Sequence, residues 1–300
     1  MSQFVSDLRV SRGLAIRRDS CSIRISVVMP SYNQVGYIER SILSVLNQNY
    51  PELELIIVDG GSTDGTVDVI RRYEEYLSYW VSEPDNGQSD ALNKGFARAT
   101  GNVFGWLNSD DLYMPGALER AATVFGEFSA KGIVYGDWLS IDSGDRTTAY
   151  EYAFDFNLNQ FKYEGFHLNA QAMFWRRDVH ERFGGFDPRL HLTMDYQMIV
   201  AFGISEGEAA FLRLPTALGC FRRHADQKTR GFTGEVLSEH RLIAHRYRFE
   251  DKFGRIGKAK RLLYRFRRGY WYIKRGGVSY FWRKLAGHRD GGRDLYVKQN

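Results

Sequence analysis

Cysteine is scarce in this chain of 300 residues, since only Cys21 and Cys220 are present, in unrelated contexts. Two such residues favour neither a disulfide framework nor a thiolate metal site, so we expect both to be small buried side chains. Long apolar runs are also missing. No stretch approaches the roughly 18–20 apolar residues of a membrane-spanning helix, and the N-terminus has no apolar signal core. We therefore expect a cytoplasmic chain.

Charge is plentiful but unevenly distributed. Residues 241–300 contain 18 Lys and Arg against 4 Asp and Glu, a net charge of +14, while the whole chain carries +5, which leaves −9 for residues 1–240. An acidic body with a basic tail indicates that the tail contacts a polyanion, either a membrane surface or a nucleic acid. Hydrophobic residues make up 43% of the sequence, enough for one large core or two small ones.

Apolar runs alternate with helical periodicity in the first part of the chain. Residues 1–22 show no clear pattern and are predicted to form a flexible leader. A β-branched run at 23–30 precedes a helical pattern at 37–46, and a second run at 53–58 precedes another at 66–76. This alternation predicts a parallel sheet covered by helices on both faces. The carboxyl ends of its strands share one edge, where such sheets bind ligands.

Three polar loops follow predicted strands at this edge, namely Ser31-Tyr32, Asp59-Gly60 and Asn108-Ser109-Asp110-Asp111. Neighbouring carboxylates repel, and burying either one unpaired costs several kcal/mol. A hard divalent cation with oxygen ligands offsets that cost. For the Asp110-Asp111 pair alone, a helix N-cap ahead of Pro115 is an equal alternative. The convergence of three polar loops favours the cation site.

The segment 79–95 lies between the second and the third of these loops in the sequence. We expect an edge strand, a Pro/Asn/Gly turn, and a helix capped by Ser89 or Asp90. Because helix N-termini favour anions, the amides here suit a phosphate, although a surface turn with an ordinary N-cap explains each residue equally well.

Three later elements are also predicted. A strand is expected within 132–140, where Gly136-Asp137 should end it, and a strand at 211–214 should be followed by a turn. Met194-Asp195 should open a helix, in which Asp195 is either a functional carboxylate or merely the N-cap.

Four sequence blocks, in this order, resemble those of family 2 glycosyltransferases with the GT-A fold: Val28-Met29-Pro30-Ser31-Tyr32-Asn33, Val58-Asp59-Gly60-Gly61-Ser62-Thr63-Asp64-Gly65, Asn108-Ser109-Asp110-Asp111, and Gly184-Gly185-Phe186-Asp187 leading to Met194-Asp195. Each block alone is weak, but four at these separations are specific. The resemblance covers about residues 26–228 and is strongest to bacterial enzymes that build surface polysaccharides. It implies an α/β GT-A fold with a mainly parallel central sheet and helices on both faces.

The resemblance also implies a division of the chain. We expect the GT-A domain at 23–235, with a nucleotide-binding half at 23–115 and an acceptor half at 116–235, before a basic helical tail at 236–300. The implied activity is inverting, metal-dependent, non-processive transfer of a sugar from a nucleotide-sugar donor to a glycan or polyprenyl-linked acceptor, in polysaccharide or cell-envelope biosynthesis. The alternatives are a nucleotidyltransferase and a catalytically weak membrane module that binds nucleotide sugars.

By the same resemblance, donor contacts fall to Ser31, Tyr32, Asp59, Asp90, Asn108 and Asp110. Asp59 matches the carboxylate that accepts the ring N–H of the base. Ser31 and Tyr32 match the floor of the base pocket, where an aromatic face can stack, although Tyr32 as core filler is an alternative. Asn108 and Asp110 match positions near the ribose or the metal.

Metal and proton chemistry fall to three further residues. Asp111 matches the direct ligand of a Mg²⁺ or Mn²⁺ ion, which screens the diphosphate of the donor. His224 lies where some relatives place an imidazole metal ligand or a diphosphate contact, and a structural histidine is the alternative. Asp195 matches the general base that inverting transfer requires at the acceptor hydroxyl.

The sequence departs from the family pattern at three positions. Met194 replaces the Glu that usually precedes the base, which we expect to be tolerated because the second position carries the proton chemistry. Asn108 replaces an Asp found in many relatives and removes one negative charge from the metal site. Leu92 replaces a common Arg, which leaves the identity of the nucleotide base open.

The tail mixes basic residues with Trp, Tyr and Phe from residue 255 to 285. Such a mixture suits an interfacial segment on anionic lipid and also suits single-stranded nucleic acid. Because an enzyme of this kind usually meets a lipid-linked acceptor, we expect peripheral binding to the inner face of the cell membrane rather than to nucleic acid. The absence of a Gln-x-x-Arg-Trp motif argues against a processive, secreting synthase.

Overall fold

The structure is a computed structural model that describes residues 23–165, 168–225, 227 and 233–287. The predicted leader, the end of the tail and Cys21 lie outside the described residues, whereas Cys220 is buried, as expected. In the described part nine strands form one sheet: β1 (Ile25–Ser31), β2 (Leu53–Asp59), β3 (Tyr79–Ser82), β4 (Val103–Trp106), β5 (Leu112–Tyr113), β6 (Ile133–Asp142), β7 (Thr147–Glu151), β8 (Met173–Arg176) and β9 (Phe211–Arg223).

Helices cover this sheet and extend beyond it. They are α1 (Ile38–Leu46), α2 (Thr66–Arg72), α3 (Gln88–Arg98), α4 (Ala117–Glu127), α5 (Leu158–Glu164), α6 (Arg177–Phe183), α7 (Met194–Ser205), α8 (Thr233–Arg246) and α9 (Arg255–Gly287). Short 3-10 turns lie at η1 (Glu74–Tyr76), η2 (Ala170–Ala172), η3 (Glu208–Ala210) and η4 (Glu250–Phe253).

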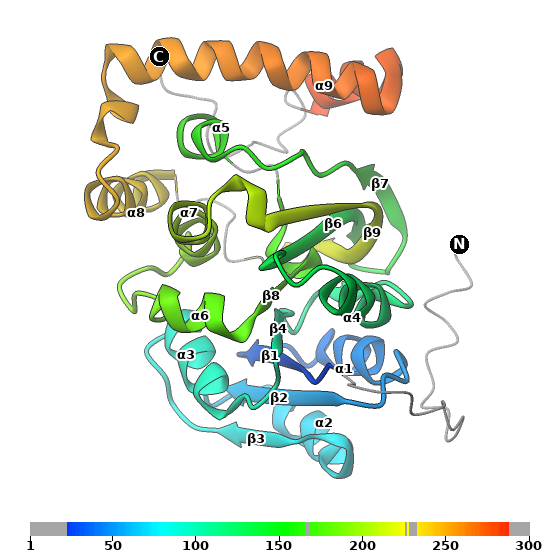
Figure 1. Cartoon of the computed structure of the whole chain (residues 1–300). Coiled ribbons are helices and arrows are strands. Elements are labelled where there is room, and N and C mark those ends of the chain that lie inside the picture. The colour runs from blue at the N-terminus through cyan, green and yellow to red at the C-terminus, as the bar shows by residue number, and fades with distance from the viewer. Residues whose placement is uncertain (1–22, 166–167, 226, 228–232, 288–300) are drawn as a thin grey trace.

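The strand order is β3-β2-β1-β4-β8-β6-β9-β5, with β7 beside β6 (Figure 1). β3, β2, β1 and β4 run parallel, as the alternation of apolar runs predicts. The register pairs Ser31 with Asp59, so β1 and β2 end level with each other. β4 pairs Trp106 with Val28 and ends there, so the chain from 107 to 111 continues toward the same edge. The predicted convergence of polar loops is therefore built into the pairing of the strands.

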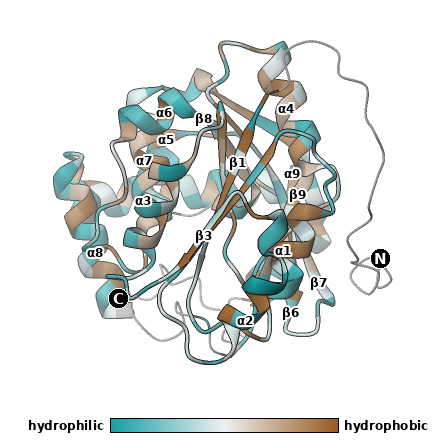
Figure 2. Ribbon diagram, turned by 90° about the horizontal axis from the view of Figure 1, so that it is seen from below, coloured by the Kyte–Doolittle hydropathy of each residue, from teal (hydrophilic) through white to brown (hydrophobic). Residues whose placement is uncertain are grey.

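The parallel strands are buried on both faces. Ile25, Val27 and Met29 face a layer that α1, α2 and α4 complete, whereas Val28 and Ile56 face a layer with α3, α6 and α7. Two-sided burial explains why these strands are continuous apolar runs in the sequence, a pattern visible in the hydropathy colouring of Figure 2. Each such side chain stabilises the fold by roughly 1.5–3 kcal/mol relative to exposure.

Two strand boundaries were predicted wrongly. β6 does not end at Gly136-Asp137 but continues to Asp142, and β9 has no turn after its first four residues. The pairing of β6 with β9 shifts at this point, because Pro215-Thr216 form a bulge that adds residues to β9. The glycine and proline signals therefore mark a bulge, and the longer β9 carries the chain on to His224 at the sheet edge.

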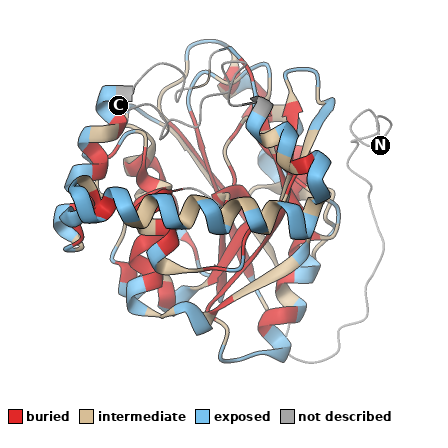
Figure 3. Cartoon of the chain, turned by 90° about the horizontal axis from the view of Figure 1, so that it is seen from above, coloured by how far each residue is buried: buried red, intermediate tan, exposed pale blue. Residues whose placement is uncertain are grey.

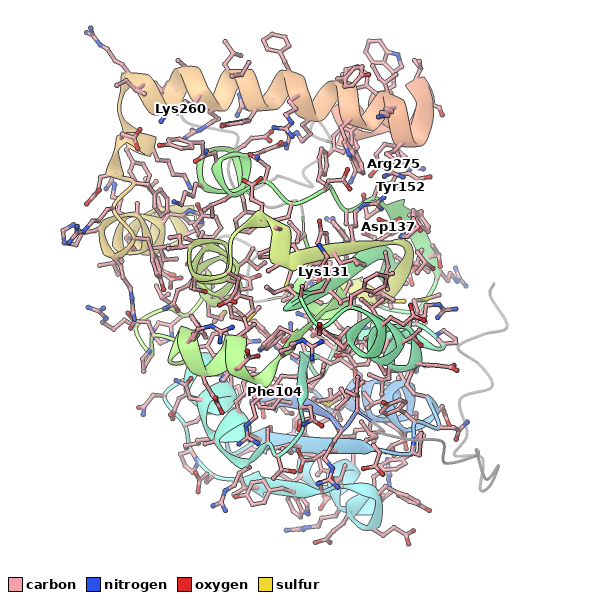
Figure 4. The ribbon with its side chains drawn as sticks, viewed as in Figure 1. Phe104, Lys131, Asp137, Tyr152, Lys260 and Arg275 are labelled. Carbon is pink, nitrogen blue, oxygen red and sulfur yellow. The ribbon has the colours of Figure 1, made fainter. Side chains whose placement is uncertain are left out.

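The C-terminal segment is helical in its described part, as predicted. α9 lies across α5, and Trp271 on its inner face stacks on Phe154 with the ring centroids 3.9 Å apart. The backbone leaves helical geometry at Gly277, where φ is 74°. Beyond this kink Tyr280 packs against Tyr152, which lies beneath the C-terminal part of α9 near Arg275 (Figure 4). No helix of the described residues is long and apolar enough to cross a membrane.

Candidate active site

The loop after β2 is organised by Asp59, which is fully buried. One oxygen of its carboxylate accepts hydrogen bonds from the backbone N–H of Gly61 (3.1 Å) and Ser62 (2.8 Å) and from the hydroxyl of Ser82 (2.7 Å). The other oxygen accepts from the Ser62 hydroxyl at 2.5 Å. Asp59 thus shapes the loop, and its second oxygen, which accepts a single hydrogen bond from the described residues, keeps a lone pair for a further donor. The contact of Asp59 with a nucleotide base stays a prediction.

Ser31 and Tyr32 lie beside this loop with their side chains uncommitted to the fold. The Ser31 hydroxyl is buried and has no hydrogen-bond partner among the described residues. Tyr32 is 61% exposed, so the alternative that it fills the core is wrong. The next residue, Asn33, ties the two loops together, because its N–H donates to the Ser62 hydroxyl at 2.7 Å. A buried hydroxyl and an exposed ring at one sheet edge suit a planar, polar ligand.

Asn108 forms several of the hydrogen bonds that hold the turn after β4. Its side-chain oxygen accepts from the indole N–H of Trp106 and from the amide of Gln88, both at 2.7 Å. Its backbone N–H donates to Gln171 at 2.9 Å, and its side-chain amide points at Asp111 at 3.4 Å. An amide can accept and donate in these directions at once, which a carboxylate cannot. The departure from Asp at this position therefore has a structural reason that the sequence alone did not reveal.

Asp110, after β4, and His224, after β9, are 114 residues apart in the sequence and meet at this turn. The Asp110 carboxylate lies 3.0 Å from Nε2 of His224, whose other ring nitrogen has no partner among the described residues. The ring of Tyr37, just before α1, packs against the imidazole with centroids 4.6 Å apart. His224 thus sits at the predicted acidic turn.

Arg222 stabilises this turn, a role that the sequence alone did not indicate. Its backbone N–H donates to Oδ1 of Asp111 at 2.8 Å, and its side-chain Nε donates to the carbonyl of Asp110 at 2.6 Å. The guanidinium is fully buried, lies over the Tyr37 ring and forms an ion pair with Asp145 in the turn after β6. Because a guanidinium has five N–H donors on a long side chain, Arg222 can contact the acidic turn and the turn that contains Asp145 at the same time.

The charge of Arg222 does not fully compensate the two carboxylates of Asp110 and Asp111. Burial and the neighbouring charge of Asp110 raise the pKa of the Asp111 carboxyl well above its usual range, against the opposing effect of Arg222. Among the residues that the structure describes, Oδ2 of Asp111 receives only the 3.4 Å contact from Asn108. In the described part of the chain no three carboxylate, imidazole or thiol groups are already gathered into a metal cage. The lone pairs and the surplus negative charge nevertheless fit a hard divalent cation.

Asp195 lies at the second position of α7, and Thr193 rather than Asp195 is the cap residue. Oδ1 of Asp195 accepts from the N–H of Tyr196 at 2.8 Å. Removal from water, and to a smaller extent the charge of Glu239, raise the pKa of the Asp195 carboxyl to about 7, against the opposing backbone hydrogen bonds. The preceding residue, Met194, is 3% exposed, so a Glu at that position would bury a charge.

The start of α3 contacts both the acidic turn and the loop that precedes α7. Gln88 holds Asn108, the Ser89 hydroxyl donates to the carbonyl of Leu190 at 2.6 Å, and a Cβ on Gly87 would lie 3.1 Å from Nδ1 of His191. The loop that leads into α7 therefore rests on the helix that contacts the acidic turn.

The prediction that Ser89 or Asp90 caps α3 is wrong, because the helix starts at Gln88 and is preceded by Gly87. Asp90 instead accepts from the N–H of Asn86 at 3.1 Å and pairs with Lys94 at 3.5 Å. Its donor-binding role stays a prediction.

Residues 26–184 match the sequence profile of glycosyl transferase family 2. A PGL/p-HBAD biosynthesis glycosyltransferase of Mycobacterium bovis is 32% identical over 57% of this chain and 66% of its own length. The putative teichuronic acid biosynthesis glycosyltransferase TuaG of Bacillus subtilis is 42% identical over 32% of this chain and 39% of its own length. The chain thus spans less than two thirds of these relatives.

Among solved structures, the mannosyltransferase PcManGT of Pyrobaculum calidifontis, in complex with GDP-Man and Mn²⁺, superimposes with a TM-score of 0.57 at 20% identity. The match covers 97% of this chain and 82% of that one. At this identity the likeness concerns the fold, and it confirms the predicted GT-A architecture.

Proposed function

Because the chain belongs to glycosyl transferase family 2, we propose that it transfers one sugar at a time, with inversion, from a nucleotide sugar to an acceptor hydroxyl in surface-polysaccharide or cell-envelope biosynthesis. The observation that carries the proposal is the meeting, at one sheet edge, of Ser31, Asp59 and the acidic turn at 108–111. The loop that leads into α7 and Asp195 rests on α3, which also contacts the acidic turn. A donor on the sheet edge and a base on α7 are the two parts that such a transfer needs.

In the proposed reaction the acceptor hydroxyl gives its proton to Asp195. The hydroxyl oxygen forms a bond to the anomeric carbon as the bond from that carbon to the diphosphate oxygen breaks, and the nucleoside diphosphate leaves with the bonding electrons. Attack opposite the leaving group inverts the anomeric centre. A base whose pKa is about 7 is matched to proton transfer near neutral pH.

Product analysis tests this reaction. We expect release of a nucleoside diphosphate and a product of inverted anomeric configuration, both lost in Asp195→Asn while donor binding persists. Asp68→Asn, an exposed carboxylate on α2, is the matched control. Release of pyrophosphate would indicate a nucleotidyltransferase instead, and donor binding without turnover in the wild type would indicate a binding module.

We propose that Asp110, Asp111 and His224 hold a Mg²⁺ or Mn²⁺ ion beside the diphosphate. The ion would neutralise the negative charge that the leaving group gains. The uncompensated charge at Asp111 and the GDP-Man and Mn²⁺ of the Pyrobaculum structure support this assignment. A panel of nucleotide sugars with Mn²⁺ should raise the melting temperature of the wild type but not of Asp111→Asn. An equal rise in EDTA would contradict a metal role.

The acceptor is proposed to be a glycan or a polyprenyl-linked sugar, met at the inner face of the cell membrane through α9. The outward side of α9 carries an apolar stripe at helical spacing in which Leu263, Phe266 and Tyr270 are 65%, 70% and 69% exposed (Figure 3). Exposed Arg267 and Lys274 flank it. Large exposed apolar side chains beside cations match the acyl boundary and headgroups of an anionic bilayer.

Liposome sedimentation tests the membrane contact on the full chain. Phe266→Ser should weaken binding to anionic vesicles about tenfold or more, since burial of a Phe side chain is worth roughly 1.5–3 kcal/mol. Phe128→Ser, a half-exposed ring beyond α4, should bind like the wild type. Equal binding to neutral and anionic vesicles, or a preference for single-stranded nucleic acid, would contradict the proposal.

A further inference from the structure

Glu239 on α8 accepts hydrogen bonds from the loop 191–193, which leads into the helix that carries the proposed base. The side chain is buried, and its two oxygens accept hydrogen bonds from three consecutive backbone N–H groups, those of His191 (2.8 Å), Leu192 (3.1 Å) and Thr193 (2.9 Å). The Thr193 hydroxyl donates a further bond at 2.8 Å. In the described part of the chain no Lys or Arg forms an ion pair with Glu239, so its charge is held by amides and one hydroxyl. Such charge-assisted hydrogen bonds are among the stronger ones in proteins.

The loop 191–193 lies between the start of α3 and α7. On one side it rests on the first turn of α3, through Leu190 and His191. On the other side Thr193 is the N-cap residue of α7, and Asp195 follows two residues later. A shift of these amides would therefore move the Asp195 carboxylate relative to α3 and, through Gln88, relative to the acidic turn. A misplacement of about 1 Å in a reacting group can cost about a hundredfold in rate.

We propose that Glu239 is a positioning residue for the proposed base: it fixes the loop 191–193 so that Asp195 points at the acceptor hydroxyl. This inference rests on the proposed function. Glu239 lies outside the family match at 26–184 and in the segment expected from the sequence to be only a basic tail.

Glu239 also affects Asp195 through its negative charge, and the pH dependence of turnover measures this effect. Glu239 faces Asp195 from α8, and its negative charge favours the protonated carboxyl. The charged and titratable groups around this end of α7 include His191 in the loop, His240 on α8 and Lys252 on η4, the last two in contact with Tyr196. Arg261 on α9 also acts on Tyr196, His240 and Lys252 through its charge. Removing the Glu239 charge should therefore shift the acidic limb of the pH profile to lower pH.

Two variants separate charge from position in the full-length protein. Glu239→Gln removes the charge and places an NH₂ group against the row of amides; it should lower kcat at least tenfold, leave the donor KM unchanged and move the acidic limb of kcat/KM to lower pH. Glu239→Asp keeps the charge but is one methylene shorter; it should lower kcat with the limb unmoved. Glu235→Gln, exposed one turn earlier on α8, should match the wild type.

The outcomes are distinguishable. Wild-type kcat in Glu239→Asp, or wild-type kcat in Glu239→Gln, would overturn the positioning role even if Asp195→Asn is inactive. If Glu239→Gln does not fold, Glu239→Asp decides, because it retains the charge and the acceptors. Full turnover in Asp195→Asn would instead refute the proposed base, whatever the Glu239 variants do.

Discussion

Asp195→Asn should make the folded protein more stable above neutral pH while removing its proposed base. Burial, and then the charge of Glu239, raise the pKa of Asp195 from 3.8 to about 7, so the ionised carboxylate is disfavoured in the folded chain. Between these two values the folded state binds more protons than the unfolded state, and stability falls as pH rises. Above about pH 7 the penalty is complete, and Asn, which cannot ionise, escapes it.

The magnitude follows from the shift. About 3 pKa units at about 1.4 kcal/mol each set an upper limit of about 4 kcal/mol on the penalty. Asp195 keeps some contact with solvent, which screens its charge, so the measured gain should be about 1–3 kcal/mol. Below about pH 3, where the carboxyl is largely protonated in both states, the gain should vanish.

Urea denaturation of the wild type and Asp195→Asn at about pH 5 and about pH 8 measures this difference. The gain in the free energy of unfolding should be larger at the higher pH. Asp68→Asn, an exposed carboxylate on α2, should change stability little at either pH. A loss of stability in Asp195→Asn, or a gain independent of pH, would refute the argument that this carboxylate is held at a cost for function.

Three further predictions concern the same site. The kcat/KM of the wild type should fall about tenfold per pH unit below about pH 7 as Asp195 is protonated, and a limb near pH 4 would contradict that assignment. Arg222→Met should reduce the free energy of unfolding by about 1.5–3 kcal/mol, because it removes the guanidinium that donates to the Asp110 carbonyl and leaves Arg40 as the remaining partner of Asp145; a loss under about 1 kcal/mol in urea denaturation would contradict the stabilising role of Arg222. Met194→Glu should lower stability and not raise turnover, since Met194 is buried; a large rise in turnover would show that the usual Glu is needed.

The parallel half of the fold could be predicted from the sequence because its signals are local. Each strand of β1, β2 and β4 is a continuous apolar run that ends in a polar loop, and parallel pairing leaves those ends at one edge. The positions of Asp59 and Asp110 at that edge followed directly. The polar alternation of later strands, by contrast, is interrupted by bulges, so Gly136-Asp137 and Pro215 gave turn signals inside β6 and β9.

The supports of the site could not be predicted, because they are non-local. Gln171 and Gln88 reach Asn108 from distant parts of the chain, and neither carries a motif. Arg222 is one of two adjacent arginines, and only the fold shows which of them is buried. Glu239 lies in a segment whose net charge is strongly positive, where one carboxylate is inconspicuous. The sequence contained the reacting groups, whereas the hydrogen bonds that orient them depend on tertiary packing.

The same packing limits how the C-terminal helices can be tested. Deletion of the tail from residue 236 would remove Glu239, and deletion from 255 would remove Trp271 from its stack on Phe154. Either truncation would change the acceptor side of the domain along with any membrane contact, so loss of activity or lipid binding in a truncated chain would not identify a cause. Point substitutions on the outward stripe, such as Phe266→Ser, leave the inner contacts intact. Because the stripe and the stack occupy different sides of α9, a membrane defect with full turnover on a soluble acceptor would assign the two roles to the two faces.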